Sequence, residues 1–314
     1  MARKDGKRSK GGQQARTSGP PPRAAPEGTP PATPRATPLR ELLRVPEGER
    51  PDLRRLDPAA TPAGPAEKAA GLAAITELAD PLAALQERLF AASTAGDRRR
   101  LLLVLQGMDT SGKGGTVKHV IGLFNPAGCR VESFKAPTPD ERDHPFLWRI
   151  MRALPRPGEI GIFDRSQYED VLVARVRELV PQSLLDRRYG QINRFEESLV
   201  DDGVTVVKVF LHISHEEQRK RLLARLADPA KRWKFSPSDI DERALWPAYQ
   251  EAYELALEHC STAAAPWFIV PADRKWYRDW AISTLLREHL EAIDPQYPTA
   301  RFDVDECRAS LIGT

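Results

Sequence analysis

The chain has 314 residues, of which 41% are hydrophobic and 29% are charged, and this composition is globular on average. Its net charge of +3 is unevenly distributed, because residues 1–45 hold ten basic and only three acidic side chains. Three widely spaced cysteines without a CxxC pair support neither a disulfide framework nor a zinc site. No apolar run reaches the roughly 20 residues that span a bilayer, and no secretory signal is visible, so we expect a cytoplasmic protein without a membrane partner.

Residues 1–45 are rich in Gly, Pro, Ala, Ser and Arg and poor in large apolar side chains. Such a segment cannot bury enough apolar surface to offset the entropy of ordering, so we predict that it is disordered. Its positive charge suits a solubilising tail or an arm that binds a polyanion, either nucleic acid or polyphosphate. The folded domain is therefore predicted to span residues 46–314.

Order is predicted to begin with a helical stretch from Ala66 to Ala92, in which Leu and Ile recur at three- and four-residue steps. Within it, Asp80-Pro81 has the form of an N-cap followed by proline at the first helical position. The stretch is therefore either two helices or one kinked helix.

From Arg100 onward, short apolar runs alternate with helical patterns. The runs are predicted to be the strands Leu101–Leu105, Arg130–Phe134, Glu159–Phe163, Val204–Ile213 and Trp267–Val270. Apolar strands that alternate with helices indicate a parallel sheet covered on both faces. We therefore predict an α/β fold with a doubly wound sheet of about five strands.

The segment Gly107-Met-Asp-Thr-Ser-Gly-Lys-Gly-Gly115 follows the first strand and precedes a helical pattern over Thr116–Phe124. This is the context of a phosphate-binding P-loop (Walker A), in which glycines let backbone N–H groups face phosphate oxygens. Lys113 is then expected to reach the terminal phosphates as a mobile cation. Other expected phosphate-binding positions are Gly107, Thr110, Ser111, Gly112, Gly114 and Gly115, with Lys118 on the helix that follows.

Two carboxylates are candidate metal ligands. The usual P-loop places a Mg²⁺-binding Ser or Thr after the lysine, but here Gly114 follows Lys113. Asp109 lies inside the loop and would repel a phosphate unless a cation stood between them, so we predict that it binds Mg²⁺. Asp164 ends an apolar strand in the Walker B manner and is expected to bind the same ion, with Arg165 beside the phosphates.

A helical lid is predicted over about residues 214–260. Ser214-His-Glu-Glu217 has the sequence of a capping box that begins a basic helix, which ends near Leu226. After a basic and aromatic turn, Ser236–Asp239 is expected to cap a second helix that reaches about His259. We expect the lid to be mobile.

Arg221 and Arg225 share one face of the first lid helix. Both can close over a phosphoryl group as arginine fingers, although a solvated basic face is the competing interpretation. The turn offers further expected contacts to phosphate or nucleotide in Lys231, Trp233 and Lys234.

These motifs, in this order, closely resemble the family-two polyphosphate kinases over about Leu53 to about Pro298. The segments that carry the resemblance are the P-loop, Phe163–Leu172, Ser214–Arg221, Asp228–Phe235 and Pro266–Trp276. The resemblance implies a thymidylate-kinase-like P-loop core, a helical lid, a homo-oligomer, and reversible Mg²⁺-dependent phosphoryl transfer between inorganic polyphosphate and nucleotides. It also implies roles at the reacting phosphates for Asp109, Lys113, Asp164, Arg165, Arg221 and Arg225.

The acceptor stays open at this point. Tyr168-Glu169-Asp170 looks like the branch of the family that accepts nucleoside monophosphates as well as diphosphates, which would place Glu169 and Asp170 near the nucleotide. Gln167, however, stands where that branch often has His, and some close relatives have Asn in place of Asp164.

Two other functions remain to be tested. An ordinary P-loop kinase would use ATP to phosphorylate a small metabolite. A non-enzymatic polyanion-binding protein would depend on residues 1–45. A GTPase is disfavoured because no NKxD-type guanine motif occurs, and we expect no specific nucleic-acid partner.

Overall fold

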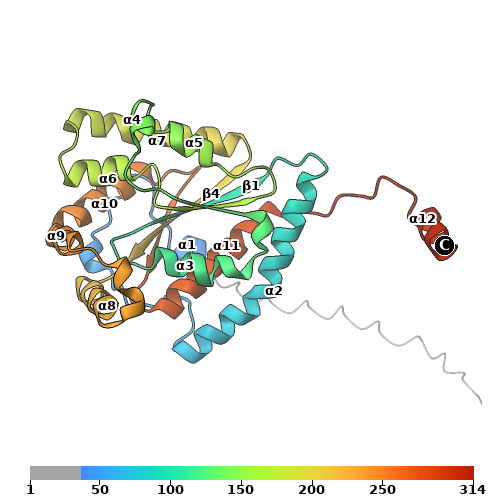
Figure 1. Ribbon diagram of the computed structural model, residues 1–314, viewed down its shortest axis with the longest axis horizontal. Helices are drawn as coiled ribbons and strands as arrows, with labels where there is room; N and C mark the ends of the chain where they lie inside the picture. Colours follow the sequence, from blue (N-terminus) through green and yellow to red (C-terminus); the bar gives the residue numbers. More distant parts are fainter. Residues whose placement is uncertain (1–36) are drawn as a thin grey trace, which may run out of the picture. The chain divides into compact units, whose positions relative to one another are not determined.

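The computed structural model describes residues 37–314, so most of the predicted tail lies outside the described residues. The described part is built on a five-stranded, all-parallel sheet with the strand order β2-β3-β1-β4-β5 (Figure 1). The strands are β1 (Arg100–Gln106), β2 (Cys129–Ser133), β3 (Ile160–Asp164), β4 (Val204–His212) and β5 (Trp267–Pro271). All five lie within a residue or two of the predicted runs, and the α/β doubly wound fold is confirmed.

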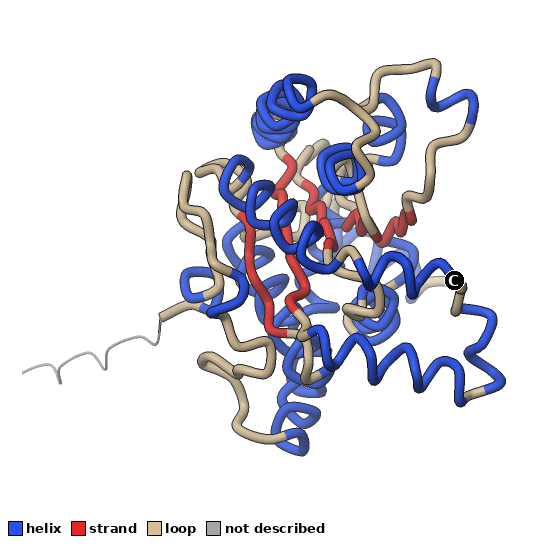
Figure 2. Tube along the Cα trace, turned by 90° about the vertical axis from the view of Figure 1, so that its left-hand side faces the viewer, coloured by secondary structure: helices blue, strands red, loops and turns tan. Residues whose placement is uncertain are grey.

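The central strands are apolar along their whole length because both of their faces are covered. Every residue of β1 is buried, and so is nearly every residue of β4. Helices lie on both faces of the sheet (Figure 1, Figure 2). A parallel strand in this position must be hydrophobic on both sides, which explains why these runs show no polar alternation.

The helices that cover the sheet form two groups. One face is covered by α1 (Leu39–Leu42), α2 (Lys68–Ser93), α3 (Lys113–His119) and α11 (Lys275–Ile293), and the other by α6 (Glu169–Val176), α7 (Gln182–Asp201) and α10 (Trp246–Cys260). α2 is one continuous helix with Pro81 inside it, which decides between the two alternatives for that stretch. The helix predicted over Thr116–Phe124 is shorter, because α3 ends at His119 and a 3₁₀ turn follows at Ile121–Leu123.

The remaining helices are short or lie outside these two layers. They are α4 (Pro139–Arg142), α5 (Trp148–Ala153), α8 (His215–Ala227), α9 (Ser238–Ala244) and α12 (Val304–Ile312), with 3₁₀ turns at Leu53–Arg55, Pro126–Gly128 and Pro229–Lys234. No helix within residues 37–314 has the length and apolarity that crossing a membrane requires.

The prediction of disorder up to residue 45 is wrong for residues 37–45. Leu39, Leu43 and Val45 are buried, and the segment extends the sheet past β5. The N–H of Val45 donates to the carbonyl of Trp267 at 2.8 Å, and the N–H of Ile269 donates to the carbonyl of Leu43 at 2.9 Å. The prediction rests on the average composition of residues 1–45, in which these three apolar side chains carry little weight.

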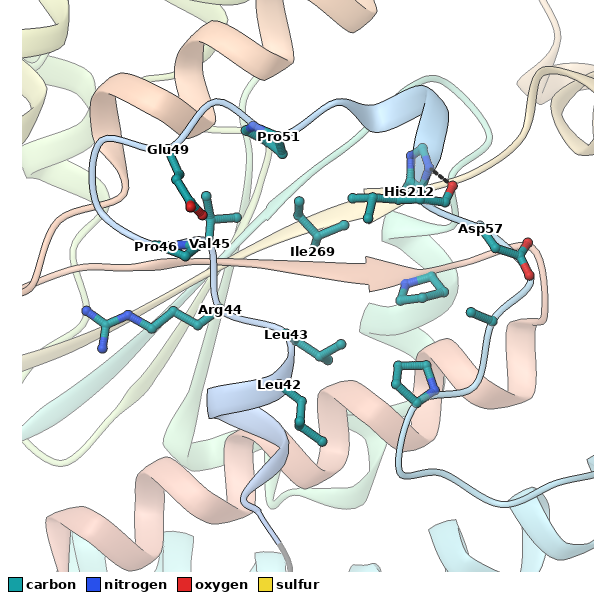
Figure 3. A pocket seen from close by; sticks show the side chains of 14 residues that line it. Leu42, Leu43, Arg44, Val45, Pro46, Glu49, Pro51, Asp57, His212 and Ile269 are labelled. Carbon is teal, nitrogen blue, oxygen red and sulfur yellow. Dashed lines mark hydrogen bonds between the residues drawn. The ribbon is translucent and has the colours of Figure 1, made fainter.

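A mostly apolar pocket of about 310 Å³ lies beside this segment. Figure 3 shows Leu43 and Val45 on one side of it, with Ile269 of β5 and His212 of β4 among the other lining residues. None of the predicted phosphate-site residues lines it, so this pocket is separate from the P-loop.

The predicted lid is also too long. The helix expected from Ser236 to about His259 is divided at Leu245 into α9 and α10, and Pro247 lies in the first turn of α10. The buried apolar side chains of α10 recur on one face and pack into the core, and they are Ala252, Tyr253, Ala256, Leu257 and Cys260. The part of the predicted lid that lies outside the core is α8, the turn Pro229–Lys234 and α9, that is residues 215–244, and both its role as a lid and its mobility stay predictions.

Candidate active site

The P-loop (Gly107–Gly115) wraps around the side chain of its own lysine. The ammonium of Lys113 donates to the carbonyl of Gly107 at 2.9 Å. Gly107 has φ +153°, and a Cβ there would stand 2.8 Å from the carbonyl oxygen of Leu211 at the end of β4. Gly112 and Thr110 also have positive φ, of +115° and +62°. The loop thus has the left-handed turns that a backbone phosphate cradle requires.

The strand register brings the Walker B carboxylate to the start of the P-loop. Asp164, the last residue of β3, is paired in register with Leu105 of β1. The N–H of Arg165 donates to the carbonyl of Leu105 at 3.1 Å, and Arg165 takes the strained φ of +67°. The buried side chain of Gln106 donates to Ser166 Oγ at 3.1 Å. Non-glycine residues with a strained backbone tend to lie at functional sites, and Thr110 and Arg165 are two such residues here.

Charged side chains converge on Lys113. Burial lowers the pKa of Lys113, while the negative charges of Asp164, Asp109 and Glu169 raise it and the positive charge of Arg165 lowers it further. The structure thus brings four of the residues that the sequence singled out near the ammonium of a fifth, Lys113.

The carboxylates of Asp109 and Asp164 fit a hard divalent cation. Mg²⁺ is usually held in such sites by one or two carboxylates, and substrate phosphates and water complete its coordination. Within residues 37–314 no group of three or more His, Cys, Asp or Glu side chains forms a complete protein cage. The donor set therefore suits a metal that arrives together with a phosphorylated substrate.

Arg225 reaches the P-loop from α8, while its predicted action on a phosphoryl group stays a prediction. Its Nη1 lies 3.1 Å from Asp109 Oδ2 and 3.8 Å from Asp239 Oδ2 of α9. Nη1 also lies 3.4 Å from the carbonyl of Lys234. The guanidinium is partly exposed, at 22% of its side-chain surface, so it lies at the boundary between loop, lid and solvent.

Arg221 has different surroundings from those of the predicted arginine finger. Its Nη1 donates to the carbonyls of Thr110 and Ser111 at 2.9 and 3.0 Å, on the P-loop. Its Nη2 donates to the carbonyls of residues 272–273 at 2.6 and 3.0 Å, in the loop after β5. Nε donates to Glu217 at 2.8 Å, and the residue is only 9% exposed. All five N–H groups are engaged, so Arg221 joins the P-loop to its neighbours and has no donor left for a phosphate.

The capping box predicted for α8 forms only in part. Ser214 Oγ accepts the N–H of Glu217 at 3.0 Å, but the carboxylate of Glu217 pairs with Arg221 and does not return to Ser214. The N–H of Ser214 instead donates to Asp273 at 2.8 Å. Gln218 donates to the carbonyl of Asp109 at 3.1 Å. The first turns of α8 are therefore fastened to the P-loop.

Sequence reasoning missed two residues at this site, Tyr253 and Arg278, and gave Asp239 only as part of a helix cap. Tyr253 is buried, which raises its pKa, and the charge of Glu169 raises that pKa further. Arg278 of α11 lies against the P-loop backbone from the side of the covering helices. No local motif marks these positions, because only the fold brings α10 and α11 to the loop.

Asp170 lies beside the site, in the first turn of α6. Burial raises its pKa, while Arg188 and Arg149 lower it from distances of 3.8 Å each. Arg149 is itself buried and donates to the carbonyl of Lys135 at 2.8 Å. Two cations thus flank the predicted nucleotide residue.

Other predicted binding residues do not meet the P-loop. Lys118 is exposed on α3, and Lys231 pairs with Asp228 at 2.7 Å. Trp233 is 78% exposed, and the ammonium of Lys234 lies 4.9 Å from its ring centroid. Within the described residues none of these side chains donates a hydrogen bond to the P-loop, so their contact with a substrate stays a prediction.

Comparisons with known proteins agree with this geometry. A profile of the family described as Polyphosphate kinase 2 (PPK2) matches residues 66–298. The AMP/ADP-polyphosphate phosphotransferase of Meiothermus ruber is 48% identical over 255 residues, which cover 81% of this chain and 94% of that protein. The ADP-polyphosphate phosphotransferase of Rhodopseudomonas palustris is 40% identical over 267 residues, covering 81% of this chain and 91% of that protein. The crystal structure of Polyphosphate Kinase 2 from Arthrobacter aurescens TC1 matches with a TM-score of 0.86 at 48% identity, covering 89% of this chain and 98% of that one.

Proposed function

Since the chain belongs to the polyphosphate kinase 2 family, we propose that it transfers a phosphoryl group from inorganic polyphosphate to a nucleoside mono- or diphosphate, reversibly and with Mg²⁺. The observation that carries this proposal is the convergence of Asp109, Asp164 and Arg165 on Lys113 in a P-loop. The relatives named above are all polyphosphate enzymes, and they give no support to an ATP-dependent metabolite kinase or a non-enzymatic polyanion-binding protein.

The reaction exchanges one phosphorus–oxygen bond for another. A terminal phosphate oxygen of the nucleotide attacks the terminal phosphorus of polyphosphate, and the bond from that phosphorus to the next phosphate breaks. The shortened polyphosphate leaves with the electron pair of that bond. The protein therefore neutralises the negative charge of the phosphates and forms no covalent bond to the substrate.

The residues divide this work in the following way. The P-loop N–H groups and Lys113 hold phosphate oxygens, and Arg225 neutralises charge from the lid side. Asp109 and Asp164 would hold Mg²⁺, and the bound ion would supply positive charge to the phosphates. Arg221 acts as a positioning residue, in place of the finger role that the resemblance implied, because its donors hold the loop carbonyls.

For the acceptor we propose ADP and, in addition, AMP. The support is the Glu169-Asp170 pair at the start of α6, together with the name of the 48% identical relative, which includes both nucleotides. We further propose a cytoplasmic homo-oligomer, which size-exclusion chromatography with light scattering tests directly.

The deciding experiment incubates the purified protein with Mg²⁺ and long-chain polyphosphate, and with AMP, ADP, GMP or GDP in turn. We expect nucleotide products that require polyphosphate and disappear when EDTA is added. Equal product formation without polyphosphate, or transfer from ATP alone to a small metabolite, contradicts the proposal.

A further inference from the structure

Arg278 is a buried cation to which the proposed chemistry assigns no role. It belongs to α11, is 2% exposed, and is held by its neighbour, because Nε and Nη2 donate to Asp279 Oδ1 at 2.8 and 2.6 Å. A side chain with so little exposure and a bidentate contact to one carboxylate oxygen cannot move aside freely.

The guanidinium of Arg278 lies directly against the P-loop backbone. A Cβ placed on Gly112 would stand 1.8 Å from Nη1, and a Cβ on Gly115 would stand 2.9 Å from Nη2. By contrast, a Cβ on Gly114 or Gly122 would meet no atom within 4 Å. Arg278 therefore occupies the space on one side of the loop where it passes into α3.

Gly115 is the informative glycine of the two. Gly112 has φ +115°, which by itself favours glycine. Gly115 lies in the first turn of α3 with an ordinary helical backbone, so conformation does not demand glycine there. The close approach of Arg278 leaves no room for a side chain at this position, which explains why a glycine stands two positions after Lys113.

We propose that Arg278 is a positioning residue for phosphoryl transfer, which supports the P-loop backbone at Gly112 and Gly115 and so sets where Lys113 meets the phosphates. The inference rests on the proposed function, because the P-loop is taken as the phosphate site. Arg221 holds the carbonyls of Thr110 and Ser111 from another direction, so the loop is fixed by two buried guanidiniums.

The first test is Arg278→Lys. Lysine keeps the charge beside Asp279 but lacks the planar fork that fills the space under the loop. Since a displacement of about 1 Å costs on the order of 100-fold in rate, we expect kcat to fall roughly 10- to 100-fold with a smaller change in KM. The matched control is Arg287→Lys, on the same helix but with a half-exposed side chain, and we expect its kinetics to be unchanged.

The second test is a double-mutant cycle with Gly115→Ala. In the otherwise native protein the added methyl meets Arg278, and we expect a loss of tenfold or more in kcat. In the Arg278→Lys background the methyl finds room, so the same change costs less than about threefold. Gly122→Ala adds the same methyl where space is open and is expected to have no effect in either background.

Folding and binding are measured alongside. Melting temperatures and urea unfolding show whether each variant folds. If Arg278→Lys does not fold, the double variant Arg278→Met with Asp279→Asn takes its place, because that double variant leaves no unpaired buried charge. Calorimetric Kd values for tripolyphosphate need no turnover and are expected to show the same coupling at the smaller size expected for KM. If the native protein proves inactive, the proposed function is rejected and the coupling can still be measured in this way. Independent effects of the two substitutions, or a fully active Arg278→Lys variant, overturn the inference.

Discussion

At the scale of single residues, Arg221 and Arg225 lie one helical turn apart on α8 but have different surroundings. The side chain of Arg221 is buried, with every donor on a backbone carbonyl or Glu217. Arg225 is partly exposed and faces the carboxylate of Asp109. Residue spacing places both on one face, but the depth of that face changes along α8.

Exchange of each arginine for lysine separates the two roles. In Arg225→Lys we expect kcat and kcat/KM to fall together by about 100-fold, because the guanidinium is lost from the transition state. In Arg221→Lys, carbonyls on the P-loop lose their partners, so the free energy of unfolding is expected to drop by about 1–3 kcal/mol. Steady-state kinetics and urea unfolding measure both quantities. A stable but catalytically dead Arg221→Lys variant would return that residue to the finger role.

The metal ligands give a second prediction at this scale. Asp109→Asn and Asp164→Asn keep the side-chain shape but remove the charge that holds Mg²⁺, so turnover is expected to fall about 10²–10³-fold. Titration with Mg²⁺ at fixed polyphosphate and ADP measures the loss. Asp201→Asn, at an exposed position of α7, is the control and stays active. Near-normal turnover of Asp109→Asn at limiting Mg²⁺ excludes Asp109 as a ligand.

At the scale of elements, a buried polar network supports the segment that follows β3. Lys208 of β4 donates to Glu196 of α7 at 2.5 Å and to the hydroxyl of Tyr168 at 2.9 Å. Tyr168 and Gln167 both donate to the other oxygen of Glu196, at 2.8 and 2.9 Å. The network thus ties β4 and α7 to the residues between Asp164 and α6.

Removal of one charge from this network is expected to be costly. Glu196→Gln leaves the ammonium of Lys208 buried without a counter-ion, and such losses amount to about 3–5 kcal/mol. Urea unfolding measures the change, with exposed Glu197→Gln as the control. An unchanged free energy of unfolding would mean that another group neutralises Lys208.

The local patterns of the chain predict its elements well, and they fail where contacts are distant. The run Leu101–Leu105 and the P-loop glycines each carry their own signal, because strand and loop depend on neighbouring residues. Helix packing determines the burial of Arg221 and the approach of Arg278 to Gly115. Neither feature can be predicted from the neighbouring residues in the sequence. For the same reason, the pattern of α10 predicted a helix but not its place in the core.

At the scale of the whole molecule, residues 37–45 belong to the folded domain, although the composition of residues 1–45 suggests otherwise. Residues 39–45 cover the edge of β5, and Ser261 Oγ donates to the carbonyl of Val45 at 2.6 Å. The N–H of Leu39 donates to Glu288 of α11 at 2.8 Å. The segment thus belongs to the folded domain.

Two shortened proteins test where the domain begins. A protein that starts at Thr37 is expected to keep its turnover and melting temperature, because every phosphate-site residue and every contact of Leu39 is retained. One that starts at Gly48 loses three buried side chains, each worth about 1.5–3 kcal/mol, and should melt markedly lower. Equal melting temperatures for the two proteins would contradict the assignment.

The same contacts impose an order on how the newly made chain acquires its structure. Leu39 is separated by 249 residues from the carboxylate that binds its N–H. At about 5–20 residues per second, the ribosome needs on the order of 10–50 seconds to supply that partner. During this time residues 39–45 lack the partners in β5 and α11 that they contact in the folded protein. Residues 39–45 are therefore expected to be among the last of the described residues to reach their final contacts.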